Sequence, residues 1–152
     1  MDIKIRYATA LAMIAHEGQV RRGTHPYSIH PVTLGMTALA NGMSTDCIIA
    51  ALLHDTIEDT WVTLEFLEGL SWISDYSLEL IKALTRPEGM TAQKHIRSIL
   101  ASKNKDLLLL KLLDTEDNLF VADGDTWPNM VASLTRYKGN KAKLEKALKE
   151  LV

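Results

Sequence analysis

Apolar residues recur along the chain at the three- and four-residue spacing of amphipathic helices. Leu and Ala dominate the apolar set, and no convincing segment alternates between apolar and polar residues as a half-buried strand would. In the first segment one stripe is predicted to face the core, and it consists of Ile3, Tyr7, Leu11 and Ile14. The pattern therefore predicts an all-α protein.

Glycine and proline residues divide the chain into segments of helical length. Ser44 can cap the helix that leads to Leu53, and Pro31 suits the first turn of the helix that leads to Gly42. We predict helices over residues 3–17, 31–41, 44–53, 63–69, 72–85, 91–102, 105–122, 128–137 and 140–151. No repeat, low-complexity tract or linker interrupts them, so we expect a single-domain helical bundle over residues 1–152.

Composition agrees with one globular domain. The 152 residues are 47% hydrophobic and 24% charged, which is close to the average for globular proteins. Lys and Arg number 17 against 19 Asp and Glu, and the net charge of -2 provides no general attraction for nucleic acid. A lone Cys47 excludes an internal disulfide, and neither a secretory signal nor a long apolar stretch is present. We expect a cytoplasmic protein without membrane or nucleic-acid partners, whose oligomeric state stays open.

Candidate chemistry lies directly after the apolar run 48–53. His54 and Glu58 are four residues apart, as are Asp55 and Asp59, so on a helix all four side chains project over one half of the surface. Carboxylates at such short distances repel one another, and each raises the pKa of the other unless a cation neutralises them. The cluster therefore predicts a binding site for a divalent metal ion.

Two further residues of ligand type stand in apolar surroundings. Asp114 follows the apolar run 107–113, where an uncompensated carboxylate would cost several kcal/mol. His30 directly precedes Pro31 at the start of a predicted helix. Imidazoles combined with carboxylates suit manganese, iron or zinc better than calcium.

These residues resemble a known family. His30, His54-Asp55 and Asp114 follow the H…HD…D pattern of the HD-domain metal-dependent phosphohydrolases. The wider sequence resembles the hydrolase domain of RelA/SpoT-type proteins, and by length the stand-alone small alarmone hydrolases. The blocks that carry this resemblance are 15–19 (AHEGQ), 26–31 (PYSIHP), 50–60 (AALLHDTIEDT), 83–86 (ALTR), 110–114 (LKLLD) and Asn118-Leu119.

The resemblance implies an HD-domain fold and removal of the 3′-pyrophosphate of (p)ppGpp, with one Mn2+ ion. It implies four metal ligands, which are His30, His54, Asp55 and Asp114. It implies an acidic pair next to the attacking water, which is Glu58 and Asp59. It also implies substrate contacts by Arg21 beside the guanine, Arg22 at a phosphate and Asn118 at the nucleoside. Iron or zinc in place of manganese stays open.

Two departures from the family's pattern leave the substrate open. After Asp114 the family continues with a basic residue, whereas this chain continues with Thr115, Glu116 and Asp117. The loop 22–25 (RGTH) also differs from the usual sequence. The alternatives are an HD-domain phosphohydrolase that acts on another nucleotide or phosphoester, and an HD fold that only binds a nucleotide or a protein.

Three other histidines are assigned structural or surface roles. His16 matches a family position but follows a helix, and we expect a hydrogen-bonded structural histidine there. His25 and His95 are expected at the surface.

Overall fold

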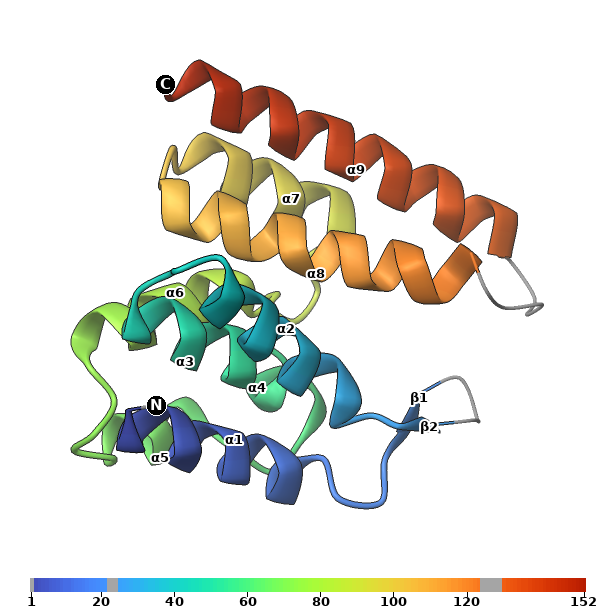
Figure 1. The fold of residues 1–152 in the computed structure, drawn as a ribbon. Coiled ribbons are helices and arrows are strands. Elements are labelled where there is room, and N and C mark those ends of the chain that lie inside the picture. The colour runs from blue at the N-terminus through green and yellow to red at the C-terminus, as the bar shows by residue number, and fades with distance from the viewer. Residues whose placement is uncertain (1, 22–24, 124–129) are drawn as a thin grey trace. The chain divides into compact units, whose positions relative to one another are not determined.

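A computed structural model describes residues 2–21, 25–123 and 130–152 (Figure 1). The chain divides into two compact units, Met1–Arg86 and Pro87–Val152. The expectation of a single domain over residues 1–152 stays a prediction. No helix among the described residues combines the length and the apolar character that crossing a membrane requires.

The first unit consists of short helices and one small ribbon of two strands (Figure 1). Strands β1 and β2 pair antiparallel, with Val20 opposite Pro26 and Arg21 opposite His25. Each strand has only two residues, so it is too short to show the alternation by which strands are predicted. In chain order the elements are α1 (Ile3–Ala15), β1 (Val20–Arg21), β2 (His25–Pro26), α2 (Ile29–Ala40), α3 (Thr45–Leu53), α4 (Thr56–Asp59), α5 (Leu64–Glu68) and α6 (Asp75–Leu84).

Helix α3 forms the core of the first unit. It packs against α1, α2 and α6, and all of its residues from Cys47 to Leu53 are buried. The predicted cap is confirmed, because the Ser44 hydroxyl accepts a hydrogen bond from the backbone N–H of Cys47. Helix α2 approaches α3 closely at Gly35, where a Cβ atom would lie 2.5 Å from Cδ2 of Leu52. Because α3 packs against three other helices, the position of its last residue, Leu53, is fixed.

The core-facing stripe predicted for α1 was wrong. Ile3 and Ile14 are 53% and 59% exposed, whereas the buried face of α1 consists of Ile5, Ala8, Ala12 and Ala15. Three of these four are alanines, whose small side chains allow close packing against α3. The larger apolar residues of the helix therefore lie outward, and their helical spacing alone does not identify the core.

The second unit consists of three helices, α7 (Ala92–Ala101), α8 (Lys105–Asp123) and α9 (Met130–Glu150). Helices α8 and α9 pack along each other, and α7 contacts both (Figure 1). Two separate helices over 128–137 and 140–151 were predicted, but α9 continues through Gly139. A glycine inside a helix costs only about 1 kcal/mol, which the packing of a long helix can offset.

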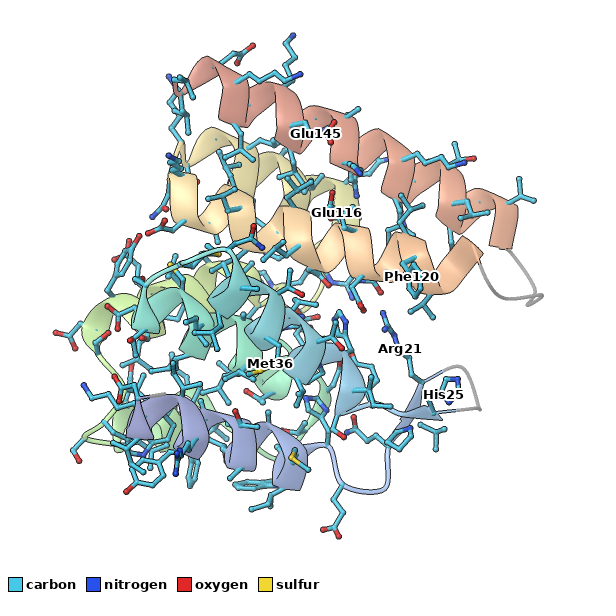
Figure 2. All side chains as sticks on the ribbon, viewed as in Figure 1. Arg21, His25, Met36, Glu116, Phe120 and Glu145 are labelled. Carbon is cyan, nitrogen blue, oxygen red and sulfur yellow. The ribbon has the colours of Figure 1, made fainter. Side chains whose placement is uncertain are left out.

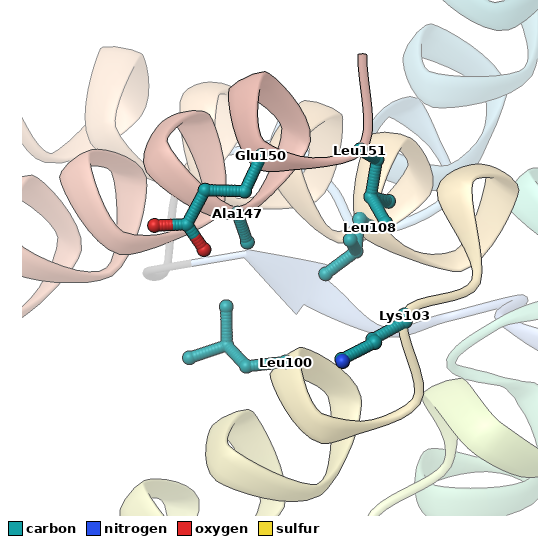
Figure 3. A pocket seen from close by; sticks show the side chains of 6 residues that line it. All are labelled: Leu100, Lys103, Leu108, Ala147, Glu150 and Leu151. Carbon is teal, nitrogen blue, oxygen red and sulfur yellow. The ribbon is translucent and has the colours of Figure 1, made fainter.

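Two further features of the second unit follow from its packing. His95 is 6% exposed on the buried face of α7, so its expected surface position was wrong. A pocket of about 160 Å³ lies among the three helices near the C-terminus (Figure 3), lined by Leu100, Lys103, Leu108, Ala147, Glu150 and Leu151. None of the predicted site residues lines it.

Candidate metal centre

The candidate metal centre lies in the first unit, where α3 ends and α2 begins. Helix α3 ends at Leu53, and His54 and Asp55 form the turn into the short helix α4. His30 lies in the first turn of α2. One oxygen of the carboxylate, Asp55 Oδ2, lies 3.0 Å from Nε2 of His54 and 3.5 Å from Nε2 of His30. The structure thus brings together three of the four predicted ligands.

These three side chains can hold a metal ion. Each offers one ligand atom, and the three atoms lie within 4.8 Å of one another. Both imidazoles are buried, since His30 is 2% and His54 is 3% exposed. Two neutral imidazoles and one carboxylate form a mixed nitrogen and oxygen set that suits a transition-metal ion.

The other ring nitrogen of His54 orients the side chain toward this cluster. His54 Nδ1 lies 2.8 Å from the carbonyl oxygen of Ala51. Because a carbonyl oxygen only accepts, Nδ1 carries a proton, and Nε2 is the nitrogen that lies beside Asp55 and would bind a metal ion. Metal-binding histidines in proteins typically donate their second nitrogen to a carboxylate or a backbone carbonyl in this way. The local backbone therefore places His54 in the tautomer that metal binding requires.

Glu58 and Asp59 follow on α4, but their surroundings differ. The Glu58 carboxylate accepts a hydrogen bond from the backbone N–H of Arg86, and its Oε2 lies 3.9 Å from Arg86 Nε. Partial burial raises the pKa of Asp59, an exposed residue, above its ordinary value of 3.8, and the charges of Asp55 and Glu58 raise it further. His16 and His54 act in the opposite direction on that pKa. The charges of the candidate ligands Asp55 and His54 therefore act on the pKa of Asp59, while Glu58 binds Arg86, two residues after the end of α6.

Asp114 lies in the second unit, on α8, and its predicted ligation stays a prediction. It is 6% exposed, and its Oδ2 accepts a hydrogen bond from Lys111 Nζ at 2.7 Å. The side-chain amide of Asn118 donates to the Oδ1 atom of the same carboxylate at 2.7 Å. The expected compensation of this buried carboxylate is therefore present on its own helix, and Asp114 and Asn118 form one hydrogen-bonded pair.

The acidic departure after Asp114 is partly neutralised inside the second unit. Glu116 Oε1 lies 3.0 Å from Lys141 Nζ on α9, and this hydrogen bond raises the pKa of Lys141. Figure 2 shows Glu116 on α8 and Glu145 on α9, and Lys141 Nζ lies 3.9 Å from Glu145 as well. Thr115 is buried and donates its hydroxyl proton to the carbonyl oxygen of Lys111. Two of the three unusual residues thus serve packing and pairing within this unit.

The two predicted substrate-binding arginines, Arg21 and Arg22, lie between α1 and α2 in the sequence. Arg21 is half-buried on β1, opposite the exposed His25 of β2 (Figure 2). Arg22 lies outside the described residues. The role of either arginine in substrate binding stays a prediction.

His16 is confirmed as a hydrogen-bonded histidine, and it leads to a residue that the sequence analysis gave no role. His16 is 2% exposed, and its Nδ1 lies 2.8 Å from Gln19 Oε1. Its ring packs on that of Tyr27, with centroids 4.8 Å apart. The Tyr27 hydroxyl donates to Asp55 Oδ2 at 2.6 Å. The sequence signals for Tyr27 are its place three residues before His30 and its position in the block 26–31, which carries part of the family resemblance.

Known proteins resemble this chain in sequence and in fold. No family model matches the chain. The bifunctional (p)ppGpp synthase/hydrolase SpoT of Escherichia coli K12 is 32% identical over an alignment of 123 residues that covers 76% of this chain and 18% of SpoT. The guanosine-3′,5′-bis(diphosphate) 3′-pyrophosphohydrolase of Aquifex aeolicus is 34% identical over an alignment of 122 residues that covers 76% of this chain and 17% of that protein.

A solved structure extends the likeness to nearly the whole chain. It belongs to a metazoan orthologue of SpoT described as hydrolysing ppGpp, and the two folds superpose with a TM-score of 0.73 at 23% identity. The match covers 99% of this chain and 94% of that one. The chain is a RelA/SpoT hydrolase-domain homologue. The predicted all-α HD-domain fold is confirmed. The chain spans less than a fifth of the length of the curated relatives named above.

Proposed function

We propose that this chain is a metal-dependent (p)ppGpp 3′-pyrophosphohydrolase. The observation that carries the proposal is the cluster of His30, His54 and Asp55, whose ligand atoms lie within 4.8 Å of one another. The cluster occurs in a homologue of proteins described as guanosine-3′,5′-bis(diphosphate) 3′-pyrophosphohydrolases. Mn2+ is the proposed ion. Fe2+ and Zn2+ are the alternatives, because they also bind imidazole and carboxylate ligands. Asp114 is the proposed fourth ligand.

The proposed reaction is hydrolysis of the ester bond at the ribose 3′ oxygen. The oxygen of a water molecule bonds to the phosphorus that carries the 3′ oxygen, and the bond between that phosphorus and the 3′ oxygen breaks. The 3′ oxygen takes up a proton, so ppGpp yields GDP and pyrophosphate. A divalent ion at the cluster would lower the pKa of water and polarise a phosphoryl oxygen.

Asp59 is the proposed general base. Its pKa is raised by burial and by the neighbouring carboxylates, which brings its proton affinity closer to that of an efficient base at neutral pH. Glu58 supports the reaction differently, because its carboxylate is engaged by the backbone of Arg86. We assign Glu58 to holding the position of α4 against the end of α6, so that the carboxyl group of Asp59 stays beside Asp55.

Substrate contacts are proposed for Arg21, Arg22 and Asn118. A guanidinium group can stack on a base and can also bind phosphate through two parallel hydrogen bonds. The amide of Asn118 donates to Asp114, so a nucleoside contact by Asn118 would link substrate binding to the proposed fourth ligand.

Release of pyrophosphate and GDP from ppGpp by the purified protein with Mn2+ tests the proposal. Equal amounts of both products are expected, with none from metal-free protein or from Asp55→Ala. The matched control is Asp75→Asn, because Asp75 is an exposed carboxylate in the first turn of α6 and its replacement leaves the cluster intact. No release by a protein that binds Mn2+ would reject ppGpp as the substrate and keep the metal centre.

A second candidate differs only in the substrate. Asp117 adds a negative charge on α8 at a position where the family has a different sequence. Such a charge weakens the binding of an alarmone, which is itself highly negatively charged. The alternative is an HD-domain phosphohydrolase acting on another nucleotide or phosphoester. A panel of nucleoside di- and triphosphates and dinucleotides, assayed under the same conditions, separates the two candidates.

A further inference from the structure

Tyr27 contacts the candidate metal centre without being one of its ligand-type residues. Its hydroxyl donates a hydrogen bond to Asp55 Oδ2 at 2.6 Å. This is the oxygen that lies 3.0 Å from His54 Nε2 and 3.5 Å from His30 Nε2. The tyrosine therefore fixes the rotation of the carboxylate at the atom where the three side chains meet.

The ring of Tyr27 is itself held in place from two sides. On one side it packs on the buried ring of His16, with centroids 4.8 Å apart and an angle of 37° between the planes. On the other side it meets His30 edge-on, with centroids 5.9 Å apart. Backbone bonds complete the arrangement, because the N–H of Tyr27 donates to the carbonyl of Gln19 and the N–H of His30 donates to the carbonyl of Tyr27.

His16 and Gln19 connect this ring to α4. The Gln19 amide donates to the backbone oxygen of Asp59 at 2.6 Å, which leaves its Oε1 as an acceptor for His16 Nδ1 at 2.8 Å. The orientation of the amide thus fixes the histidine with its proton on Nδ1. A single amide side chain links the ring that supports Tyr27 with the helix that carries Asp59.

A purely structural role explains these contacts less well than a role in metal binding. Tyr27 is half-buried, so water could satisfy its hydroxyl without any protein partner. The hydroxyl instead donates to a carboxylate that is only 18% exposed. Residues that hydrogen-bond to ligating carboxylates orient them, and their removal typically lowers metal affinity about 10- to 100-fold.

We propose that Tyr27 is a positioning residue that holds the Asp55 carboxylate ready for a divalent metal ion, and that His16 and Gln19 hold Tyr27. The inference rests on the metal centre of the proposed function and adds three residues to it. Tyr27 acts through Asp55 and needs no contact with the reacting phosphate. Its removal is therefore expected to change metal affinity more than it changes the stability of the fold.

The test is the affinity of the full chain for Mn2+, measured by calorimetry without nucleotide, for the wild type and for Tyr27→Phe. The variant keeps the ring and loses only the hydroxyl. Its Kd for Mn2+ is expected to rise about 10- to 100-fold. The Tm of the metal-free protein is expected to change by no more than about 4 °C, because one hydrogen bond is lost. Gln19→Ala is expected to weaken Mn2+ binding by a smaller factor.

Tyr7→Phe is the matched control, because Tyr7 is 48% exposed and packs on Trp72, away from these ligands in the sequence and in its contacts. Its Mn2+ affinity is expected to equal that of the wild type. If Tyr27→Phe and the wild type bind Mn2+ with equal affinity, the role of Tyr27 is overturned and the metal centre is kept. Absence of Mn2+ binding by the wild type would overturn the metal centre, and the inference with it.

Discussion

The Glu58 carboxylate accepts a hydrogen bond from the backbone N–H of Arg86, twenty-eight residues further along the chain. This contact ties α4 to the end of α6 and occupies Glu58, whereas the next residue, Asp59, carries the raised pKa. Two adjacent acids that look equivalent in the sequence therefore have different surroundings, and they are expected to contribute differently to turnover.

Asp59→Asn is expected to lower kcat for ppGpp hydrolysis about 100- to 10,000-fold, the usual contribution of a general base. Glu58→Gln keeps a carbonyl oxygen that can accept from Arg86, so its loss is expected to be smaller. Steady-state pyrophosphate release from both variants, at saturating Mn2+, measures the difference. Equal losses would show that the two acids act as a unit.

Replacement of a candidate ligand is expected to abolish metal binding. His54→Ala and Asp55→Ala should each raise the Kd for Mn2+ by more than about 100-fold. Loss of a residue that only hydrogen-bonds to a metal ligand already lowers metal affinity about 10- to 100-fold. Calorimetry on the metal-free proteins provides the measurement. His25→Ala, at an exposed histidine of β2, serves as the control and should bind Mn2+ as the wild type does. Retained affinity in both ligand variants would reject the centre.

The raised pKa of Asp59 predicts how the stability of the metal-free protein depends on pH. The folded state binds this proton more tightly than the unfolded state, so the group favours folding below pH 3.8 and loses that contribution as pH rises through its folded pKa. Asp59→Asn removes the carboxylate and leaves the backbone bond from Gln19 intact. The variant is expected to have the higher Tm at neutral pH, and the difference should shrink on acidification.

Thermal unfolding of metal-free wild type and Asp59→Asn between pH 3 and pH 8 provides this measurement. Glu65→Gln, an exposed acid in the first turn of α5, controls for the loss of one negative charge. A lower Tm for Asp59→Asn at neutral pH would contradict the prediction.

Gly35→Ala is expected to destabilise the first unit. The added Cβ would lie 2.5 Å from Leu52 Cδ2, and Leu52 is fully buried in the core of the unit. Overpacking of this kind costs about 1 to 3 kcal/mol. Gly139→Ala is the matched control, because nothing lies within 4 Å of its Cβ and alanine favours a helix by about 0.5 to 1 kcal/mol. Urea unfolding of the two variants should shift in opposite directions.

The sequence alone predicted most of the local structure and the residue types of the candidate metal centre. The helical spacing, the Ser44 cap, the buried run that ends in His54 and the residue types of the H…HD…D pattern are local features, so they could be predicted before any contact was known. The sequence also indicated that an acid beside a long apolar run, Asp114, must be compensated. These inferences rest on periodicity and on the cost of burying charge, which operate along the chain.

Only the tertiary structure decided which faces are buried and which atoms meet. Helix α1 buries Ala8 and Ala12 and exposes Ile3, because close packing on α3 favours small side chains over large ones. His95 is also buried, on the face of α7 that carries Ile96 and Ile99. The bond from Tyr27 to Asp55 joins residues twenty-eight positions apart. Such contacts depend on how the chain folds back on itself, and no local pattern of residues encodes them.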